Sequence, residues 1–375
     1  MALTNDIEKL LEEDARRRRY PLAVKLELLP VCNLNCKMCY IRTDMAQVRA
    51  SGGLIPADKW IALAQELRAA DTLLLLLTGG EVFLYPEFRR LYTALCGMGF
   101  GININTNATL IDEEALAWLR EMPPRLMSIS LYGASDETYE ALCGQKGMFT
   151  RVSRAIDGLL ESGIRVELKT MLNPINEHEA QAMADFARAR GVYYEAAAYA
   201  FPPARKAERA QAFRFTPAQA ARCTIDINRR SATPEQFDRD NAEYLEKYER
   251  TKGEAPGEVW GFTCAAANSA CWITWKGEMT PCGLIPTPCT HPFEQGFLAS
   301  WEALKAACDR IRMSPACSSC DKRQICTACP AANLAETGRY DCASPFHCEM
   351  TALMLERIRQ LAAKRTIVEG EQNPS

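Results

Sequence analysis

The fold of this chain is decided by one stretch, Cys32-Asn33-Leu34-Asn35-Cys36-Lys37-Met38-Cys39-Tyr40. Its three thiols are separated by three and then by two residues, a spacing that packing in a hydrophobic core does not require. The nearest further cysteine along the chain is Cys96, so the stretch contains no fourth ligand for a tetrahedral site. Three thiolates on a tight loop can bind three irons of a [4Fe–4S] cube and leave the fourth iron open to another ligand. A structural zinc loop with a distant fourth ligand is the alternative reading.

An apolar run, Leu22 to Leu29, directly precedes the cysteine loop and reads as a first strand that Pro30 ends. A cluster in this loop would lie at the carboxyl end of a strand, where parallel α/β folds place their chemistry. Cys-x3-Cys-x2-Cys followed by an aromatic residue resembles the signature of the radical S-adenosylmethionine (radical SAM) enzymes. The resemblance implies that the amino and carboxylate groups of S-adenosylmethionine (SAM) chelate the open iron, with Tyr40 at the cofactor.

From Leu22 to Tyr199 the sequence alternates between strand and helix patterns six times. The strands are expected at Val24–Leu29, Leu73–Leu77, Ile102–Asn105, Met127–Ser130, Arg165–Met171 and Tyr194–Ala198. The intervening helices are expected near Ala57–Ala69, Pro86–Met98, Asp112–Arg120, Phe149–Ser162 and Glu177–Arg190. Such repetition predicts an α/β fold with a parallel sheet and right-handed crossovers. Six units fit an incomplete barrel, and the radical SAM resemblance likewise implies a partial (β/α)6 TIM-like barrel.

Polar residues follow several of these strands. The motif Thr78-Gly79-Gly80-Glu81 comes after the second strand, and its two glycines allow the backbone to approach a ligand closely. In this position it resembles the motif with which radical SAM enzymes bind the SAM amino group, which implies cofactor contacts for its glycines and its glutamate. Asn107 follows the third strand at the same rim. Ser128 and Ser130 share one side of the fourth strand. The resemblance implies that one of them contacts the SAM ribose or carboxylate, and Ser130 is our candidate.

Composition and charge exclude several classes of function. The net charge of −3 and the pI near 5.9 give no electrostatic footprint for nucleic acid. The N-terminal residues lack the apolar core of a signal peptide, and no apolar run reaches membrane-spanning length. Seventeen cysteines without a secretion signal point to metal binding in a reducing cytoplasm rather than to disulfides. With three histidines in the whole chain, acid–base chemistry based on histidine has few candidates.

At 375 residues the chain is long enough for two domains. We expect an N-terminal helix within residues 1–21, the radical SAM barrel over 22–200 and a charged helical bridge over 201–261. Within this bridge, the run from Gly253 to Gly257 reads as a linker. A small cysteine-rich domain is expected over 262–348, and a C-terminal helix with a polar tail over 349–375.

The C-terminal third contains a second group of cysteines. These are Cys264, Cys271 and Cys282, the block Cys317-x2-Cys320-x5-Cys326-x2-Cys329, and the pair Cys342 and Cys348. The segment from Trp272 to Cys282 predicts a short β-hairpin that turns at Lys276-Gly277 and brings Cys271 and Cys282 to the same end. The order of cysteines, with Gly277 five residues before Cys282, resembles the SPASM extension of radical SAM enzymes that modify peptides and proteins.

The SPASM resemblance implies two auxiliary [4Fe–4S] clusters whose ligands cross over along the chain. One cluster would take Cys264, Cys271, Cys282 and Cys329, and the other would take Cys317, Cys320, Cys326 and Cys348. Cys342 competes with Cys348 for the last place, and a pair of zinc sites is the alternative because Cys-x2-Cys also suits zinc. If Cys271 is a ligand, the first auxiliary cluster has no iron free for a substrate thiolate, which disfavours thioether formation.

The radical SAM resemblance implies that one electron from the first cluster cleaves SAM to methionine and a 5′-deoxyadenosyl radical, which abstracts hydrogen from an unactivated carbon. The expected function is modification of a ribosomally made peptide by cross-linking, epimerisation or oxidation. The alternative is oxidation of a protein side chain, as in anaerobic sulfatase maturases, or of a small alcohol. Those maturases carry a proton-accepting Asp directly after the third cysteine of the extension, where this chain has Gly283. A non-catalytic iron–sulfur electron carrier would need neither the Gly-Gly-Glu motif nor the barrel.

The expected partners are a peptide or protein substrate and an electron donor such as flavodoxin or ferredoxin. Many peptide-modifying relatives carry a leader-binding domain before the barrel, whereas only residues 1–21 precede the first strand in this sequence. A separate leader-binding protein, or recognition by the barrel and bridge alone, would replace that domain. Glu195 and Glu278 are the candidate acid–base residues. The substrate, the bond that is formed and the oligomeric state are not defined by the sequence.

Overall fold

The structure is a computed structural model, and it describes residues 2–203, 213–252, 254–255, 257–258 and 260–372. The bridge expected over 201–261 and the linker expected at Gly253 to Gly257 lie partly outside these residues. Within the described residues, no helix is both long enough and apolar enough to cross a membrane.

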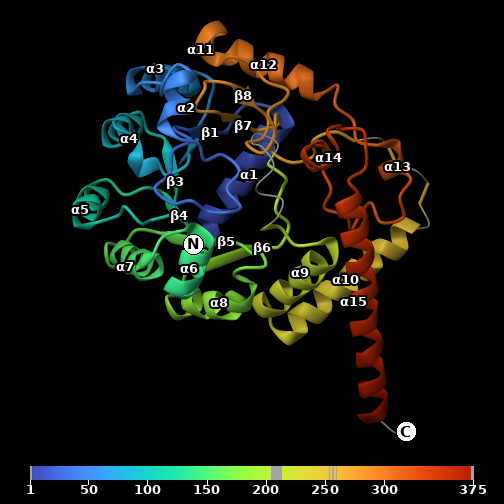
Figure 1. The fold of residues 1–375 in the computed structure, drawn as a ribbon. Helices are drawn as coiled ribbons and strands as arrows, with labels where there is room; N and C mark the ends of the chain where they lie inside the picture. Colours follow the sequence, from blue (N-terminus) through green and yellow to red (C-terminus); the bar gives the residue numbers. More distant parts are fainter. Residues whose placement is uncertain (1, 204–212, 253, 256, 259, 373–375) are drawn as a thin grey trace.

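An eight-stranded sheet forms the centre of the molecule, with the strand order β6-β5-β4-β3-β2-β1-β7-β8. Six neighbouring strands run parallel and follow the order of the sequence: β1 Ala23–Glu27, β2 Leu74–Thr78, β3 Gly101–Thr106, β4 Leu126–Ser130, β5 Val166–Met171 and β6 Tyr193–Ala197. Figure 1 shows helices α3, α4, α5, α7 and α8 along the outer side of this curved sheet. The predicted partial barrel of six βα units is therefore confirmed.

The helices between these strands also agree with the sequence pattern. They are α3 Ala57–Ala69, α4 Phe88–Gly97, α5 Glu113–Glu121, α7 Met148–Glu161 and α8 Ala180–Ala189, with the 3-10 turn η2 Glu177–Glu179 before α8. Three short elements were not predicted, namely α2 Met45–Ala50, η1 Val82–Leu84 and α6 Asp136–Cys143. Elements of this length are too short to show the apolar period of a helix.

The apolar strand residues alternate between the two faces of the sheet. Leu75 and Leu77 of β2 are almost fully buried, whereas Leu74 and Leu76, which alternate with them, are half-buried on the other face. Fully burying a side chain of this size stabilises the fold by about 1.5–3 kcal/mol. The large buried rings of the surrounding helices, such as Trp60 of α3, belong to the same core, so this layer holds the barrel together.

The predicted hairpin is present as β7 Ala270–Ile273 and β8 Met279–Thr280, with Gly277 in the turn at φ +83°. Its place in the fold was not predicted, because β7 pairs in parallel with β1 and sets Cys271 opposite Val24. A partial barrel leaves the outer edge of its first strand without a partner, and pairing with another strand satisfies that edge. The cysteine-rich region therefore extends the barrel sheet.

Three long helices form a layer beside the barrel. The bridge contributes α9 Pro217–Ser231 and α10 Pro234–Lys252, and the C-terminal helix α15 Pro345–Gln372 packs along both of them (Figure 1). Ile225, Phe237 and Ile358, one from each helix, form a small core of their own. The short helices α11 Pro292–Gln295, α12 Phe297–Cys308, α13 Pro315–Ser318 and α14 Pro330–Thr337 connect β8 to α15.

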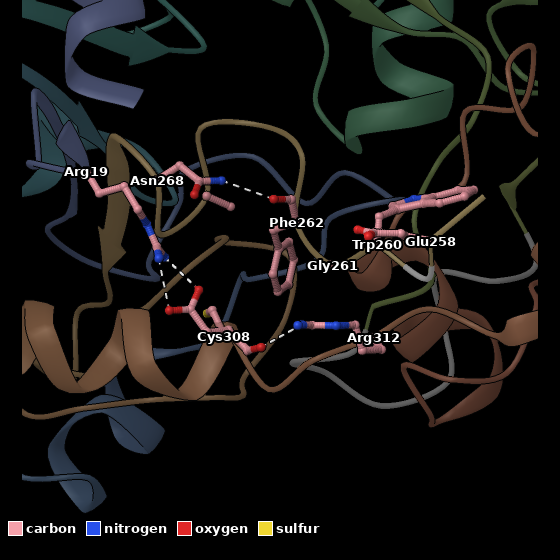
Figure 2. A pocket seen from close by; sticks show the side chains of 10 residues that line it. Arg19, Glu258, Trp260, Gly261, Phe262, Asn268, Cys308 and Arg312 are labelled. Atoms are coloured by element: carbon pink, nitrogen blue, oxygen red, sulfur yellow. Dashed lines mark hydrogen bonds and ion pairs between the residues drawn. The ribbon is translucent and has the colours of Figure 1, made fainter. Parts of the chain in front are cut away.

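The predicted N-terminal helix is α1 Ala2–Arg18, and the residue after it is tied to the C-terminal half of the chain. Arg19, with φ at 58°, donates from both Nη atoms to the Asp309 carboxylate at 2.9 Å (Figure 2). Its Nη2 also donates to the Ala267 carbonyl oxygen at 3.2 Å, and Trp301 Nε1 donates to the Arg19 carbonyl oxygen at 3.1 Å. These contacts join the end of α1 to α12 and to the turn before β7.

Candidate active site

A cavity of about 500 Å³ lies at the carboxyl ends of the parallel strands, the end of such a sheet that carries chemistry. Its lining contains eight residues that the sequence assigns to the first cluster or to SAM: Cys32, Cys36, Cys39, Tyr40, Gly79, Gly80, Asn107 and Ser130. The fold thus brings together residues that follow or end four neighbouring strands. Among the predicted cofactor residues, Glu81 alone is absent from the lining that the described residues form.

The cysteine loop is fastened to the end of α6, a helix that the sequence pattern did not predict. The amides of Asn35 and Lys37 donate to the carbonyl oxygens of Cys143 and Leu142, at 2.9 and 3.0 Å. These are carbonyls in the last turn of a helix, which have no partner within the helix itself. The loop therefore takes its position from α6 as well as from β1.

Backbone amides also point at the sulfur atoms of the loop. Leu34 N donates to Cys32 Sγ at 3.4 Å, and Arg42 N donates to Cys39 Sγ at 3.2 Å. Burial raises the pKa of Cys32 to about 12, while the bond from Leu34 opposes that rise. A buried thiol of this kind loses its proton when it binds a metal cation, and amide donors then stabilise the resulting thiolate. This donor set fits three irons of a [4Fe–4S] cluster.

Asn107 braces the loop through a network of side-chain hydrogen bonds. Its Nδ2 donates to Asn33 Oδ1 at 3.0 Å and to Cys32 Sγ at 3.5 Å. The Asn33 amide donates in turn to Thr109 Oγ1 at 2.7 Å, and that hydroxyl donates to Asn107 Oδ1 at 2.6 Å. The network fixes the side chain that carries one cluster thiol. The predicted contact of Asn107 with SAM stays a prediction.

The two glycines of the Gly-Gly-Glu motif lie directly against the start of the cysteine loop. A Cβ atom at Gly79 would lie 2.4 Å from the Leu29 carbonyl oxygen, and one at Gly80 would lie 2.2 Å from the Val31 carbonyl oxygen. Gly80 N also donates to the Leu29 carbonyl oxygen at 2.7 Å. Glycine is required here because two backbones are in contact, which leaves the outward side of the turn free for a ligand.

Glu81 is turned away from the cavity and is 1 % exposed. Its carboxylate accepts hydrogen bonds from Thr106 Oγ1 at 2.7 Å, Asn107 N at 2.8 Å and Phe83 N at 3.2 Å. Burial raises the pKa of Glu81, and these three bonds oppose the rise. The carboxylate therefore holds the turn after β3 in place. This geometry does not support the predicted direct contact between Glu81 and SAM.

A second cavity, of about 220 Å³, collects four of the C-terminal cysteines. Cys317, Cys320, Cys326 and Cys348 all line it, which is the set that the SPASM resemblance implies for one auxiliary cluster. Cys342 and Cys348 are both exposed, but Cys342 is not part of this lining. The arrangement favours Cys348 over Cys342 as the last ligand.

Cys329 of the other predicted auxiliary site lies near two further cysteines of that site. Burial raises the pKa of Cys329, and the charges of Cys282 and Cys264 raise it further. Cys329 also caps α14, with its Sγ accepting a hydrogen bond from Ala332 N at 3.4 Å. Cys329 therefore lies at the start of α14, close enough to Cys282 and Cys264 for their charges to act on it.

Cys271 does not join that group. On β7 it faces the same side of the sheet as Val24 of β1, is 1 % exposed and belongs to the main apolar core. Burial raises the pKa of Cys271 to about 12, and the positive charge of Lys25 opposes this rise. The expectation that the hairpin delivers Cys271 to the first auxiliary cluster is therefore not supported. Alternation along a strand turns its side chain toward the covering helices.

Neither predicted acid–base residue reaches the main cavity. Glu195 lies on β6, is 53 % exposed and pairs with Lys169 at 3.4 Å. Glu278 lies in the hairpin turn, where its carboxylate accepts from Thr274 Oγ1 at 3.4 Å. Two tyrosines that were not predicted as site residues, Tyr132 and Tyr199, line the cavity instead. Each follows a predicted strand, which is the signal that could have identified it.

A third cavity, of about 330 Å³, lies where the end of α1 meets α12 (Figure 2). Two cationic side chains, Arg19 and Arg312, line it together with Asp309 and Glu258. Arg19 is paired with the Asp309 carboxylate at 2.9 Å, and Arg312 Nη1 donates to the Asp309 carbonyl oxygen at 2.5 Å. Both guanidinium groups are therefore hydrogen-bonded within the protein.

Comparison with known families agrees with this geometry. Residues 26–187 match the family model described as the radical SAM superfamily. This part of the chain is a radical SAM domain, and the protein is a radical SAM enzyme whose cofactors are a [4Fe–4S] cluster and SAM. The cysteine-rich C-terminal region fits the SPASM-type relatives that modify peptides.

The relatives differ in what their names say they do. AdoMet-dependent heme synthase of Methanosarcina barkeri is 23 % identical over 337 residues, covering 85 % of this chain and 94 % of that protein. Sporulation killing factor maturation protein SkfB of Bacillus subtilis is 25 % identical over 274 residues, covering 73 % of this chain and 63 % of that protein. The solved structure of Streptococcus suis SuiB bound to precursor peptide SuiA has a TM-score of 0.66 at 18 % identity, covering 88 % of this chain and 76 % of that chain. The last of these shows a shared fold.

Proposed function

We propose that this radical SAM enzyme modifies a ribosomally made peptide by cross-linking, epimerisation or oxidation. When bound, the cluster and SAM supply a 5′-deoxyadenosyl radical that abstracts hydrogen. The role of the protein is to bind the peptide, to hold one of its C–H bonds in the cavity and to exclude water. Its similarity to a named maturation protein supports this assignment.

The observation that carries the assignment is the position of the cavity at the open edge of the sheet. β6 is the last strand of the sheet, and its exposed residue Ala197 lines the cavity together with Ala200 and Phe201, which follow it. An extended peptide could add to this strand and reach the cavity, because extended chains commonly bind along an unpaired strand edge.

The ligand assignments form part of this proposal. We assign the SAM-binding cluster to Cys32, Cys36 and Cys39, and the second auxiliary cluster to Cys317, Cys320, Cys326 and Cys348. The first auxiliary cluster is assigned to Cys264, Cys282 and Cys329, without Cys271. The reaction also needs an electron donor such as flavodoxin or ferredoxin, and a separate leader-binding protein is a further proposed partner. A cytoplasmic location would keep all 17 cysteines reduced.

The packing around Gly283 opposes a sulfatase-maturase reaction. A Cβ atom at this position would lie 2.5 Å from two atoms of the Trp272 ring. An Asp in the same place would therefore displace the indole, whose Nε1 donates to Glu27 at 3.0 Å. The proton acceptor of that reaction does not fit at this position.

A heme-forming reaction on a porphyrin is the second candidate. The observation that favours it is coverage, because the similarity to the heme synthase of Methanosarcina barkeri extends over 94 % of that protein. A cavity of about 500 Å³ could also admit the edge of a flat macrocycle.

Anaerobic co-expression tests the two candidates against each other. The enzyme would be produced with the short peptide encoded next to its gene, and the peptide would be analysed by mass spectrometry after growth in D2O. We expect loss of one or more pairs of hydrogen atoms, or deuterium gained at one residue, and neither change with a Cys36→Ala variant. An unchanged peptide, together with conversion of an added iron porphyrin by the purified enzyme, would contradict the peptide assignment and favour heme formation.

A further inference from the structure

The main cavity offers few groups that can exchange a proton. Among the described residues that line it there is no Asp, Glu, His, Lys or Arg. Apart from the three cysteine thiols, the titratable side chains are those of Tyr40, Tyr132 and Tyr199. Tyr40 directly follows Cys39, and Tyr132 is hydrogen-bonded to Ser130 and lies close enough to Cys36 for its charge to act on the tyrosine. Tyr199 is hydrogen-bonded to a carboxylate that lies outside the cavity.

That carboxylate belongs to Glu336 of α14. The Tyr199 hydroxyl donates to Glu336 Oε1 at 2.8 Å. Arg214 donates to the same carboxylate, from Nη2 to Oε1 at 2.6 Å and from Nη1 to Oε2 at 3.3 Å. The side chains of Arg214 and Glu336 are 10 % and 11 % exposed. A buried, doubly hydrogen-bonded pair of this kind holds the carboxylate in one orientation.

Four segments, from two distant regions of the sequence, meet at this point. Tyr199 follows β6, Arg214 precedes α9, Glu336 lies in α14, and Phe346 and His347 lie in the first turn of α15. The Tyr199 ring contacts His347 at 4.2 Å and Phe346 at 5.2 Å between centroids. The Arg214 guanidinium lies over the Phe346 ring at 4.5 Å. The Tyr199 ring, which belongs to the cavity lining, is therefore held against the C-terminal helices, and its hydroxyl is fixed on Glu336.

We infer that Tyr199 and Glu336 form a proton relay that serves the main cavity. A substrate O–H or N–H bond next to the carbon that has lost hydrogen breaks, and its proton goes to Tyr199 Oη. The proton that Tyr199 already carries goes to Glu336 Oε1 along the existing hydrogen bond. Two protons each move one step, so that the substrate loses one proton, Glu336 gains one and Tyr199 stays protonated; no electron moves, and the step is balanced within the protein and substrate. Tyr199 is the catalytic residue, and Glu336 is a positioning residue that acts through it.

The relay rests on the proposed function and narrows it. Oxidation and cross-linking release a proton from the substrate, whereas epimerisation returns hydrogen to carbon and releases none. A relay whose acceptor is a buried carboxylate outside the cavity suits the first two. The substrate class is then a peptide whose reacting carbon carries, or is conjugated to, a hydroxyl or amide N–H group.

The coupling between the two side chains is tested without any substrate. Burial raises the pKa of Tyr199 most, the Glu336 charge and hydrogen bond raise it further, and Arg214 opposes the rise. With 3,5-difluorotyrosine at position 199 of the apoprotein, 19F NMR would follow its ionisation. We expect Glu336→Gln to lower this pKa by about one unit or more, and Glu336→Asp to preserve it. An unchanged pKa in the Gln variant would overturn the relay.

The second test uses the peptide encoded beside the gene and compares two products. We expect Tyr199→Phe to form 5′-deoxyadenosine at the wild-type rate while modified peptide falls about 100-fold, the usual size of a lost acid–base group. The matched control is Tyr193→Phe, because Tyr193 is 64 % exposed at the start of β6. Loss of both products, or of neither, in Tyr199→Phe would overturn the relay. Failure of the wild-type enzyme to modify the peptide would instead overturn the proposed function, and the relay with it.

Discussion

Gly80 shows at the scale of single residues how closely the cofactor site is built. Its position against the Val31 carbonyl oxygen leaves no space for a Cβ atom, which would lie at 2.2 Å. We expect Gly80→Ala to push the Gly-Gly turn away from the cysteine loop at a cost of about 1–3 kcal/mol. SAM affinity, measured by equilibrium dialysis on reconstituted protein, should fall at least about tenfold, which corresponds to about 1.4 kcal/mol.

Gly97, in the last turn of α4, is the matched control for this substitution. A Cβ atom there would meet nothing within 4 Å. Gly97→Ala should leave SAM affinity unchanged and raise stability by about 0.5–1 kcal/mol, because alanine loses less conformational freedom in a helix. Equal SAM affinity in the two variants would show that the Gly-Gly turn does not shape the cofactor site.

Much of the site at this scale could be predicted from the sequence, because its residues are close together in it. The spacing of Cys32, Cys36 and Cys39 and the pair of glycines are local patterns that a short window contains. The orientation of Glu81 could not be predicted, since it depends on partners from the turn after β3. The bond between Tyr199 and Glu336 joins residues 137 positions apart, which no spacing rule connects.

At the scale of elements, β7 decides which cysteine can reach a cluster. Its pairing with β1 sets Cys271 on the same side as Val24, within the apolar core. We expect Cys271→Ser to keep the full iron content of about twelve per chain after reconstitution, and Cys282→Ser to lose about four. Iron and acid-labile sulfide assays measure both. A loss of iron in the Cys271 variant equal to that in the Cys282 variant would restore Cys271 as a ligand.

The short helix α6 supports the cysteine loop and depends on its N-terminal cap. Ser135 Oγ accepts a hydrogen bond from Thr138 N at 3.2 Å and also bonds to Glu179. We expect Ser135→Ala to lower the free energy of unfolding by about 1 kcal/mol. Thermal unfolding of the apoprotein measures this change. The control is Ser231→Ala at the exposed end of α9, which should stay within about 0.5 kcal/mol of wild type, and an equal effect in both would refute the role of the cap.

Elements differ in how far the sequence predicts them. The six strands and the five long helices were predicted because their apolar periods extend over many residues. The helix α6 carries no such period, although Ser135 and Gly144, which caps its other end at φ +75°, mark its limits. The hairpin was predicted from its turn, but its partner β1 lies about 250 residues away, and local patterns do not specify such a pairing.

At the scale of the whole molecule, three separate groups of cysteines belong to one continuous fold. One group lies at the carboxyl end of the barrel, one around the start of α14 and one in the cavity beside α15. The sheet links them, because β7 adds to β1, and the packing of α15 on α9 and α10 fixes the third group. Since the groups share no thiol, each should bind its cluster independently.

Independence of the three sites predicts additive losses of iron. Wild-type protein reconstituted without oxygen should contain about twelve irons per chain, and a Cys32/Cys36/Cys39→Ala variant about eight. A Cys317/Cys320→Ala variant should likewise retain about eight and keep the ability to bind SAM, because its substitutions lie in a different cavity. About four irons in the wild type and none in the first variant would contradict both auxiliary assignments. The C-terminal cysteines would then be zinc ligands or plain thiols, and a zinc assay on the same samples distinguishes these two outcomes.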